Sequence, residues 1–374
     1  MKILVFTDWF FPGSQAGGPI QSLISFMKNS SETFYVITRN TDLNSTIPYS
    51  GVQSNQWVKS FADNIQVYYL NEEHLDEKFI SKILSEINPE RIYLNSMWSP
   101  KFTLLPLQVF RKKNISEKVV LAPRGMLKPA AFNQKGLKKK LFLLFAKLNN
   151  FYGNIQWHAT SEIEQTEIKN HFPKAKIRLA PNISNAAIST VRKERKDTFR
   201  ILTVGRISPE KGYYEAVESM REWNPNQSSV QWDIIGLKEN EELVRAIEKV
   251  KNDFPSLNIQ IHGHKSGEDL RLFFEKAHLF FLPSRGENYG HAIAEALSNG
   301  IPVVISDQTP WKNLEEAKAG KASSLNPIHL SESLDFFVKL NPDEYHTWSQ
   351  GALNYAKLYV NSPETFALNK NLFK

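Results

Sequence analysis

The chain has 374 residues, 41% of them hydrophobic and 23% charged, which is enough to bury two cores of ordinary size in a globular protein. The absence of cysteine excludes disulfides, thiolate nucleophiles and cysteine-based metal sites, and it favours the interior of a cell. A formal net charge of +7 leaves nucleic acid, anionic lipid and phosphorylated small molecules open as partners.

Short apolar runs, separated by helix-like stretches, follow one another along the chain. In chain order they are KILVFT at 2, FYVIT at 34, RIYLN at 91, KVVLA at 118, KIRLA at 176, FRILTVG at 199, VQWDIIG at 230, NIQIHG at 258, HLFFLP at 278 and PVVIS at 302. Apolar strands that alternate with helical patterns are typical of parallel sheets covered on both faces. We therefore expect an α/β protein with two doubly wound domains.

The first of these runs ends at Asp8, and no stretch of about 18 uninterrupted apolar residues occurs anywhere in the chain. The sequence thus predicts neither a signal peptide nor a membrane-spanning helix. We expect a cytoplasmic protein that is either soluble or peripheral at the inner face of the cytoplasmic membrane.

The first loop, FTDWFFPGSQAGGPIQSL, contains glycines that invite comparison with phosphate-binding loops. Gly13 and Gly18 have the spacing of a P-loop, but Pro19 stands where the lysine is needed, and the loop has no Gly-x-Gly-x-x-Gly. A nucleoside triphosphatase and a nicotinamide dehydrogenase are therefore disfavoured. Gly17 and Gly18 still permit close approach of the backbone to a ligand.

Basic residues are concentrated in the first half of the chain. Between Lys101 and Lys147 there are twelve lysines and arginines and one acid, Glu117. Within this region, residues 137–151 (LKKKLFLLFAKLNNF) carry a lysine cluster and, at helical spacing, the apolar residues Leu141, Phe142, Leu144, Phe145 and Leu148. An interfacial helix on anionic lipid has this pattern, and so does a helix that packs on its own sheet with an exposed basic end. Both interpretations stay open.

Residues 182–197 (NISNAAISTVRKERKD) are polar and lack a strong period, so we expect the interdomain linker there. The predicted domains are residues 1–184 and 185–355. The remaining tail, 356–374, is helical and too short for a domain of its own.

The stretch VGRISPEKGYYEAV (204–217) reads as a strand, a loop and the start of a helix. It places Arg206 and Lys211 at the carboxyl end of the second domain's first strand. Two cations at this point would neutralise a diphosphate as it becomes a leaving group, which is the kind of electrostatic stabilisation that usually contributes most to catalysis.

The most informative stretch is PSRGENYGHAIAEALSNGIPVVIS (283–306), in which a polar loop joins a buried strand to a helix over about 290–299. Such a turn directs free backbone N–H groups and the positive end of the helix dipole at a phosphate. Glu287 and Glu295 would be repelled by that phosphate, so they should accept hydrogen bonds from hydroxyl groups instead. Phosphate together with hydroxyls indicates a sugar nucleotide.

These residues carry a resemblance. The Glu287-x7-Glu295 pair, the Gly-Arg-x-x-x-x-Lys-Gly turn at 205–212 and the early Gly-Gly loop look like the group 1 retaining glycosyltransferases of the GT-B fold, and LAPRGMLKPAAF at 121 looks like a subset of that family found in bacterial surface-polysaccharide assembly. The resemblance covers nearly the whole chain and is strongest over 199–307. It implies two facing Rossmann-like domains, an N-terminal one that binds the acceptor and a C-terminal one that binds the nucleotide sugar, with the final helix crossing back onto the first.

The resemblance also implies roles. Glu287 would contact the donor sugar, Glu295 the ribose, and Arg206 and Lys211 the diphosphate of a UDP- or GDP-type donor. Further donor contacts are expected from the backbone or from glycines at Gly17, Gly18, Gly263, Asn288, Tyr289 and Gly290.

On the acceptor side the sequence departs from the family. Many members have a histidine near the reacting centre, whereas the candidate strand ends here read Leu94-Asn95-Ser96-Met97-Trp98 and Pro123-Arg124-Gly125. Asn95, Trp98 and Arg124 are the candidates for the saccharide acceptor, which could be carried on a lipid. His158 is interpreted as a core or strand-end histidine. His262 and His264 lack a nearby third ligand for a metal.

The resemblance implies retention of configuration, by same-face attack with the leaving phosphate oxygen taking the acceptor's proton; a covalent intermediate on Glu287 is the minority alternative. No Asp-x-Asp occurs, so we expect no metal and no other cofactor. Competing functions are a sugar-nucleotide epimerase or phosphorylase on the same fold and, less favoured, a noncatalytic nucleotide- or polyanion-binding protein. No nucleic-acid module is apparent, and we expect no nucleic-acid partner.

Overall fold

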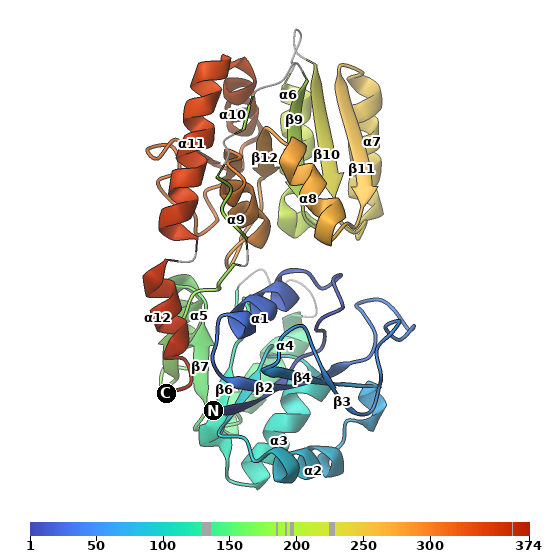
Figure 1. Cartoon of the computed structure of the whole chain (residues 1–374), viewed down its shortest axis with the longest axis vertical. Coiled ribbons are helices and arrows are strands. Elements are labelled where there is room, and N and C mark those ends of the chain that lie inside the picture. Colours follow the sequence, from blue (N-terminus) through green and yellow to red (C-terminus); the bar gives the residue numbers. More distant parts are fainter. Residues whose placement is uncertain (129–135, 185, 191–192, 195–197, 224–228, 361) are drawn as a thin grey trace. The chain divides into compact units, whose positions relative to one another are not determined.

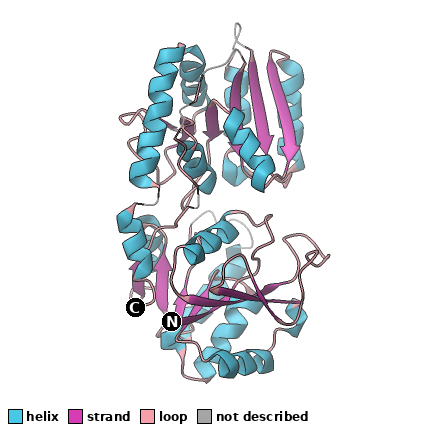
Figure 2. Cartoon of the chain, in the orientation of Figure 1, coloured by secondary structure: helices cyan, strands magenta, loops and turns pink. Residues whose placement is uncertain are grey.

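The structure is a computed structural model that describes residues 1–374 except 129–135, 185, 191–192, 195–197, 224–228 and 361. The described chain divides into two compact units. Unit 1 comprises Met1–Ile183 and Pro363–Lys374, and unit 2 comprises Ser184–Ser362. Each unit contains a parallel sheet with helices on both faces (Figures 1 and 2).

The sheet of unit 1 has the strand order β3-β4-β2-β1-β5-β6-β7-β8, and every described pair is parallel except β3 with β4. The strands are β1 (Lys2–Phe6), β2 (Thr33–Arg39), β3 (Trp57–Lys59), β4 (Ile65–Leu70), β5 (Arg91–Leu94), β6 (Val119–Leu121), β7 (Gln156–Ala159) and β8 (Lys176–Leu179). Because the chain builds outward from β1 on one side before returning to β5 on the other, the strand order reverses between β1 and β5.

Successive residues of a strand point to opposite faces, and β1 shows how this divides the core of unit 1. Ile3 and Val5 pack in one hydrophobic cluster with α1 (Gly18–Lys28), while Leu4 and Phe6 pack in another with the helices of the opposite face. The remaining helices of unit 1 are α2 (Glu77–Ile87), α3 (Leu105–Lys112), α4 (Gly136–Leu148), α5 (Glu162–His171) and α12 (Pro363–Lys370), with short turns at η1 (Glu72–His74), η2 (Pro100–Leu104) and η3 (Ser116–Lys118).

Unit 2 repeats the arrangement with the strand order β11-β10-β9-β12-β13-β14. Its strands are β9 (Phe199–Val204), β10 (Val230–Ile235), β11 (Leu257–Gly263), β12 (Leu279–Leu282), β13 (Val303–Ser306) and β14 (Gly320–Ser323). Its helices are η5 (Pro209–Lys211), α6 (Tyr213–Glu222), α7 (Glu241–Asp253), α8 (Gly267–Lys276), α9 (His291–Ser298), α10 (Pro327–Lys339) and α11 (Pro342–Tyr359). The order reverses between β9 and β12, and in such sheets ligands bind at the carboxyl ends of the two strands that flank the reversal.

The connection between the two units is shorter than the linker expected over 182–197. The change of unit falls between Ile183 and Ser184. Beyond it, Ile188 packs against the hydrophobic core of unit 2, and the backbone N–H of Ser189 donates a hydrogen bond to the carbonyl of Ser298 at 2.7 Å. Ile188 and Ser189 of the polar segment therefore pack on unit 2. Residues 185, 191–192 and 195–197 of the segment lie outside the described residues.

The predicted start of the tail at 356 is seven residues too early, because α11 continues to Tyr359 within unit 2 and the chain enters unit 1 at Pro363. The last residues are held there by hydrogen bonds to backbone carbonyls. The guanidinium of Arg91 donates to Phe373 at 3.0 Å, and the side-chain amide of Gln156 donates to Leu372 at 2.7 Å.

Candidate active site

Two loops of unit 2 meet at the reversal of strand order: the β9 loop (residues 205–212) and the β12 loop (residues 283–290). The N–H of Arg285 and the hydroxyl of Ser284 both donate to the carbonyl of Glu210, at 2.9 and 3.1 Å. Gly212 has φ +73°, and a Cβ there would lie 1.7 Å from the carbonyl oxygen of Pro283. The loops thus pack backbone against backbone, which only glycine permits at this position.

The contact between the loops brings two predicted site residues together. Lys211 Nζ lies 2.6 Å from Glu287 Oε1, although the residues are 76 positions apart in the chain. Their side chains are 23% and 10% exposed, so the pair is largely withdrawn from water while one edge stays accessible. The carboxylate therefore holds the ammonium group in place beside the helix that follows the β12 loop.

Arg206 is also paired, with Glu239, an acid that is not among the site residues predicted from the sequence. Its Nη1 donates to both carboxylate oxygens of Glu239 at 3.0 Å, and the arginine side chain is 46% exposed. Glu239 follows β10, the strand beside β9, so its position at the carboxyl edge of the sheet was the signal that could have identified it. The Glu239 side chain is 27% exposed, so an incoming phosphate would compete with a partly buried carboxylate for the more exposed guanidinium group.

The amino end of α9 opens at the same edge of the sheet. Its N-cap is Gly290, in the left-handed conformation at φ +81°, and its first turn contains no acidic residue. The preceding turn is fixed by Trp311, whose indole N–H donates to the carbonyl of Tyr289 at 2.6 Å and whose ring packs against that tyrosine. The backbone of Asn288, Tyr289 and Gly290 thus leads into an uncapped helix start, a favourable environment for an anion.

Glu295 lies one turn further along α9. Burial raises the pKa of its carboxyl group to about 7. No described residue donates a hydrogen bond to this carboxylate or forms an ion pair with it, in contrast to Glu287. A largely buried carboxylate without a protein partner is an acceptor for ligand hydroxyl groups.

Gly263 and His262 end β11, on the same edge. Gly263 has φ +71°, and a Cβ added there would meet no atom within 4 Å. His262 Nε2 lies 2.7 Å from Asp233 Oδ1 on the neighbouring β10, so this histidine is engaged by a carboxylate. Within the described ranges, no group of three His, Asp or Glu side chains is placed to hold a metal ion.

Unit 2, which contains these loops, is similar to a known protein family. Residues 184–354 match the profile of the glycosyl transferases group 1. The matched residues span most of unit 2, which begins at Ser184 and ends at Ser362.

Other similar proteins extend the likeness to both units. An uncharacterized glycosyltransferase of Methanocaldococcus jannaschii is 23% identical over 310 residues, or 75% of this chain and 71% of that protein. The amylovoran biosynthesis glycosyltransferase AmsK of Erwinia amylovora is 31% identical over 145 residues, 35% of either chain. The structure of Anabaena HepE in complex with UDP-glucose has a TM-score of 0.69 at 17% identity, covering 100% of this chain and 98% of its own. The fold is that of the GT-B glycosyltransferases, as the sequence predicted.

In unit 1 of this GT-B chain, the predicted glycines lie at the start of α1. Gly17 is the N-cap, with φ +63°, and a Cβ there would meet no atom within 4 Å. Gly18 is the first residue of the helix. The loop they close follows β1, one of the two strands at the reversal in unit 1.

Two of the three acceptor-side candidates form an internal network. Arg124, in the left-handed region at φ +56°, donates to Asn95 Oδ1 at 2.8 Å and to the hydroxyl of Tyr93 at 3.0 Å. Tyr93 also contacts His158 Nδ1 at 2.7 Å, and His158 Nε2 lies 2.7 Å from the carbonyl of Ala180. Burial, with the nearby Arg124 charge, lowers the pKa of His158 to about 3. This histidine is a neutral core residue, as predicted.

Trp98, the third candidate, is partly exposed. Its indole N–H donates to the carbonyl of Met126 at 3.3 Å, and its ring packs edge-on against Phe142 of α4, with ring centroids 5.6 Å apart. The part of the PRGM-type stretch from 129 to 132 lies outside the described residues.

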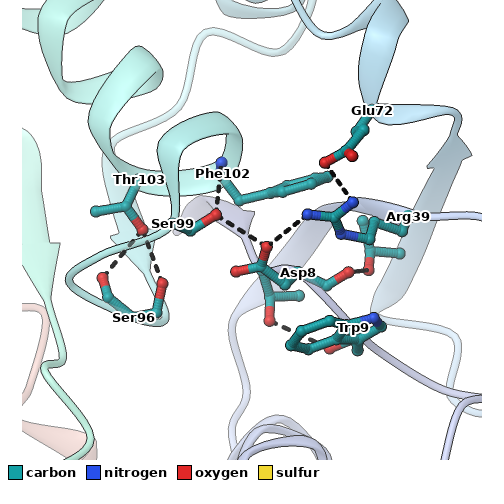
Figure 3. Close-up of polar contacts among 10 residues, drawn as sticks. Asp8, Trp9, Arg39, Glu72, Ser96, Ser99, Phe102 and Thr103 are labelled. Atoms are coloured by element: carbon teal, nitrogen blue, oxygen red, sulfur yellow. Dashed lines mark hydrogen bonds and ion pairs between the residues drawn. The ribbon is translucent and has the colours of Figure 1, made fainter. Parts of the chain in front are cut away.

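Sequence reasoning missed an acidic residue at the reversal in unit 1 (Figure 3). Asp8 Oδ1 accepts hydrogen bonds from Ser99 Oγ at 2.9 Å and from Arg39 Nη2 at 3.1 Å, and Arg39 also pairs with Glu72. The guanidinium group of Arg39 lies over the ring of Trp9. Burial raises the pKa of the Asp8 carboxyl group, against the opposing effect of Ser99 and Arg39.

This network joins residues that follow β1, β4 and β5 to Arg39 at the end of β2, so it spans the carboxyl ends of four adjacent strands. The available signal was that Asp8 is the first charged residue after a wholly buried strand. From the sequence alone, Asp8 marks only the end of the first apolar run.

Proposed function

We propose that this chain is a retaining, metal-independent glycosyltransferase that moves a sugar from a UDP- or GDP-type nucleotide sugar to an acceptor hydroxyl group in bacterial surface-polysaccharide assembly. The observation that carries the proposal is the meeting of the β9 and β12 loops at the reversal of strand order, where a cation, a helix start and two acids converge. The match of unit 2 to the glycosyl transferases group 1 supports the class of reaction.

The cations would bind the donor diphosphate. Lys211 is held in place by Glu287, and Arg206 is accessible and can exchange Glu239 for a phosphate. As the bond from the anomeric carbon to the phosphate oxygen breaks, negative charge grows on the diphosphate, and both cations stabilise it. The backbone of Asn288–Gly290 at the start of α9 would complete the phosphate site.

The acids would bind hydroxyl groups. Glu295, without a described protein partner, is assigned to the ribose, and Glu287 to the donor sugar. Gly263 leaves open space at the end of β11 where the nucleotide base can approach the backbone, and Gly17 and Gly18 do the same at the end of β1.

In the proposed reaction the acceptor oxygen attacks on the face from which the diphosphate departs. The new bond forms between that oxygen and the anomeric carbon, and the acceptor's proton passes to the leaving phosphate oxygen. A dedicated protein base is then not needed, which agrees with the lack of a first-domain histidine at the strand ends 94–98 and 123–125. Arg206 and Lys211 do the work that a metal ion does in other transferases.

The acceptor is proposed to be a saccharide, carried on a lipid at the inner face of the cytoplasmic membrane. Asn95 is only 5% exposed and both its polar side-chain atoms are engaged, so it and Arg124 would shape the acceptor side from within. Trp98, which is partly exposed, and the Asp8 network would contact the saccharide directly. Relatives such as AmsK, whose name assigns it to amylovoran biosynthesis, support the surface-polysaccharide assignment.

Product analysis tests the reaction. Purified protein is incubated in EDTA with each candidate nucleotide sugar, with and without a saccharide acceptor, and products are followed by NMR. We expect release of nucleoside diphosphate that depends on the acceptor, and a product with the donor's anomeric configuration. A changed sugar nucleotide without acceptor would instead identify an epimerase, and inverted product or a strict metal requirement would refute the corresponding part of the proposal.

A further inference from the structure

Helix α4 is apolar on two opposite faces. Its inner face packs on unit 1: Leu143 and Ala146 are buried in the core, and Phe142 packs against Trp98 and Phe151. On the other side the outer stripe, defined as five large apolar residues between 53% and 78% exposed, consists of Leu137, Leu141, Leu144, Phe145 and Leu148. At 3.6 residues per turn these five share one narrow face, opposite Leu143 and Ala146.

This arrangement bears on the two interpretations that the sequence left open, and its apolar face differs in membership from the one expected from the sequence. The sequence grouped Phe142 with the exposed apolar residues, whereas it belongs to the inner face, and Leu137 belongs to the outer stripe. A helix that only covers its own sheet needs one apolar face and presents polar residues outward. Five adjacent exposed large side chains therefore indicate a surface that is covered in function.

Charge decides what covers it. Lys138 flanks one side of the outer stripe, Lys140 and Lys147 flank the other, and no acidic residue occurs from 136 to 148. Lysine stems can lie along apolar surface with the ammonium groups at phosphate level. A second copy of the same helix would bring lysines against lysines, whereas an anionic bilayer offers an apolar interior beneath negative headgroups.

We propose that the outer stripe of α4 inserts into the headgroup region of an anionic membrane and docks the protein there. Among the described residues no helix is long and apolar enough to span a membrane, so the contact would be interfacial. The inner face of α4 touches Trp98, which links the docking surface to the acceptor side. This last link rests on the proposed function, whereas the docking itself does not.

Sedimentation with vesicles of phosphatidylcholine, with or without a large fraction of phosphatidylglycerol, tests the proposal. Wild-type protein should bind the phosphatidylglycerol vesicles and lose binding as salt is added. The triple variant Leu141→Gln, Leu144→Gln, Leu148→Gln should bind at least roughly a hundredfold more weakly. The variant Lys138→Gln, Lys140→Gln, Lys147→Gln should lose roughly a hundredfold on anionic vesicles only.

The matched control replaces two exposed apolar residues elsewhere, Ile328→Gln and Leu358→Gln, and should bind like wild type. All variants should keep the wild-type circular dichroism and nucleotide-induced thermal shift, so a failure to dock is distinguishable from a failure of the donor site. Equal binding by the stripe variant, or indifference to lipid charge, would overturn the proposal. Light scattering that shows a dimer broken by the stripe variant, without vesicle binding, would assign the stripe to a second copy instead.

Discussion

The carboxyl group of Glu295 has a pKa of about 7 in the folded protein against an ordinary value of 4.5, because burial disfavours its charged form. Between these two pH values the folded state keeps a proton that the unfolded state has lost, so the free energy of unfolding falls as pH rises through this window and stays lower above it. Glu295→Gln removes the cost. At pH 8 we expect the ligand-free variant to exceed wild type in free energy of unfolding by up to about 3 kcal/mol, and therefore to melt at a higher temperature. This difference should vanish near pH 4.5.

The same substitution should weaken nucleotide binding, because an amide is a poorer acceptor for ribose hydroxyls than a carboxylate. We expect about tenfold weaker binding of the preferred nucleoside diphosphate at pH 8, measured by calorimetry. Since the site carboxyl ionises near pH 7, wild-type affinity should rise about tenfold more than that of the variant between pH 6 and 8.

Glu167 is the matched control. Its pKa is also raised to about 7 by burial, but it lies on α5 in unit 1. Glu167→Gln should leave nucleotide affinity and its pH dependence unchanged. If both variants bind like wild type, Glu295 does not contact the ligand.

Lys211 should matter for the chemical step. Lys211→Met removes a cation from the departing diphosphate and leaves the Glu287 carboxylate without its partner, so we expect kcat to fall by roughly 10²- to 10³-fold. Arg285→Met is the control, since Arg285 lies on the adjoining β12 loop but pairs with Glu215 at 2.6 Å, and it should change kcat little. Equal losses in both variants would point to general disruption of the loops rather than to a role for Lys211.

At the scale of single residues, the sequence pointed to Lys211, Glu287 and Glu295 because polar residues after buried strands gather at one sheet edge. It could not show that Lys211 pairs with Glu287 or Arg206 with Glu239. Those pairs form because β9 lies between β10 and β12 in the sheet. The periodicity of the apolar runs does not predict this strand order.

At the scale of the elements, the candidate site depends on the close packing of the β9 loop against the β12 loop. A substitution at Gly212 tests this packing. Gly212→Ala would force a Cβ to 1.7 Å from the carbonyl of Pro283 and also strain a backbone at φ +73°. We expect a lower melting temperature and loss of nucleotide binding, because the β9 and β12 loops must separate.

Gly51→Ala is the comparison, because Gly51 has the same φ of +73° but open space around its Cβ position. This substitution should lower the free energy of unfolding by only about 1 kcal/mol, because alanine is strained in the left-handed backbone conformation. Nucleotide binding should stay intact. A Gly212→Ala protein no less stable than Gly51→Ala would contradict the described loop packing.

Among the elements, the strands that are apolar throughout were predicted well. The run HLFFLP matches β12, which ends at Leu282, and the helix expected over about 290–299 is α9. The strands that the sequence did not predict lack a long, continuous apolar run. β4 (IQVYYL) alternates with polar residues, β7 (QWHA) and β3 (WVK) are short, and β14 (GKAS) is an edge strand of small and polar residues.

At the scale of the whole molecule, each unit has its own reversal of strand order with acids and cations at the carboxyl edge. Unit 2 carries the proposed donor site, and unit 1 carries the Asp8 network, which we assign to the proposed acceptor site. The division at 183/184 was predicted to within one residue of the described change of unit, because the polar stretch begins there. The packing of Ile188, within that stretch, against the core of unit 2 was not predictable, since it depends on a single side-chain contact.

The most direct test of the central claim, a nucleoside diphosphate site in unit 2, is thermal stabilisation of the whole chain in EDTA. Wild type and Glu295→Gln are melted with UDP, GDP, ADP, CMP, NAD and S-adenosylmethionine. We predict that one nucleoside diphosphate stabilises wild type, by about 2.7 kcal/mol at roughly 100 times its Kd, and stabilises the variant less. No response to any diphosphate, or equal stabilisation of the two proteins, would contradict the account.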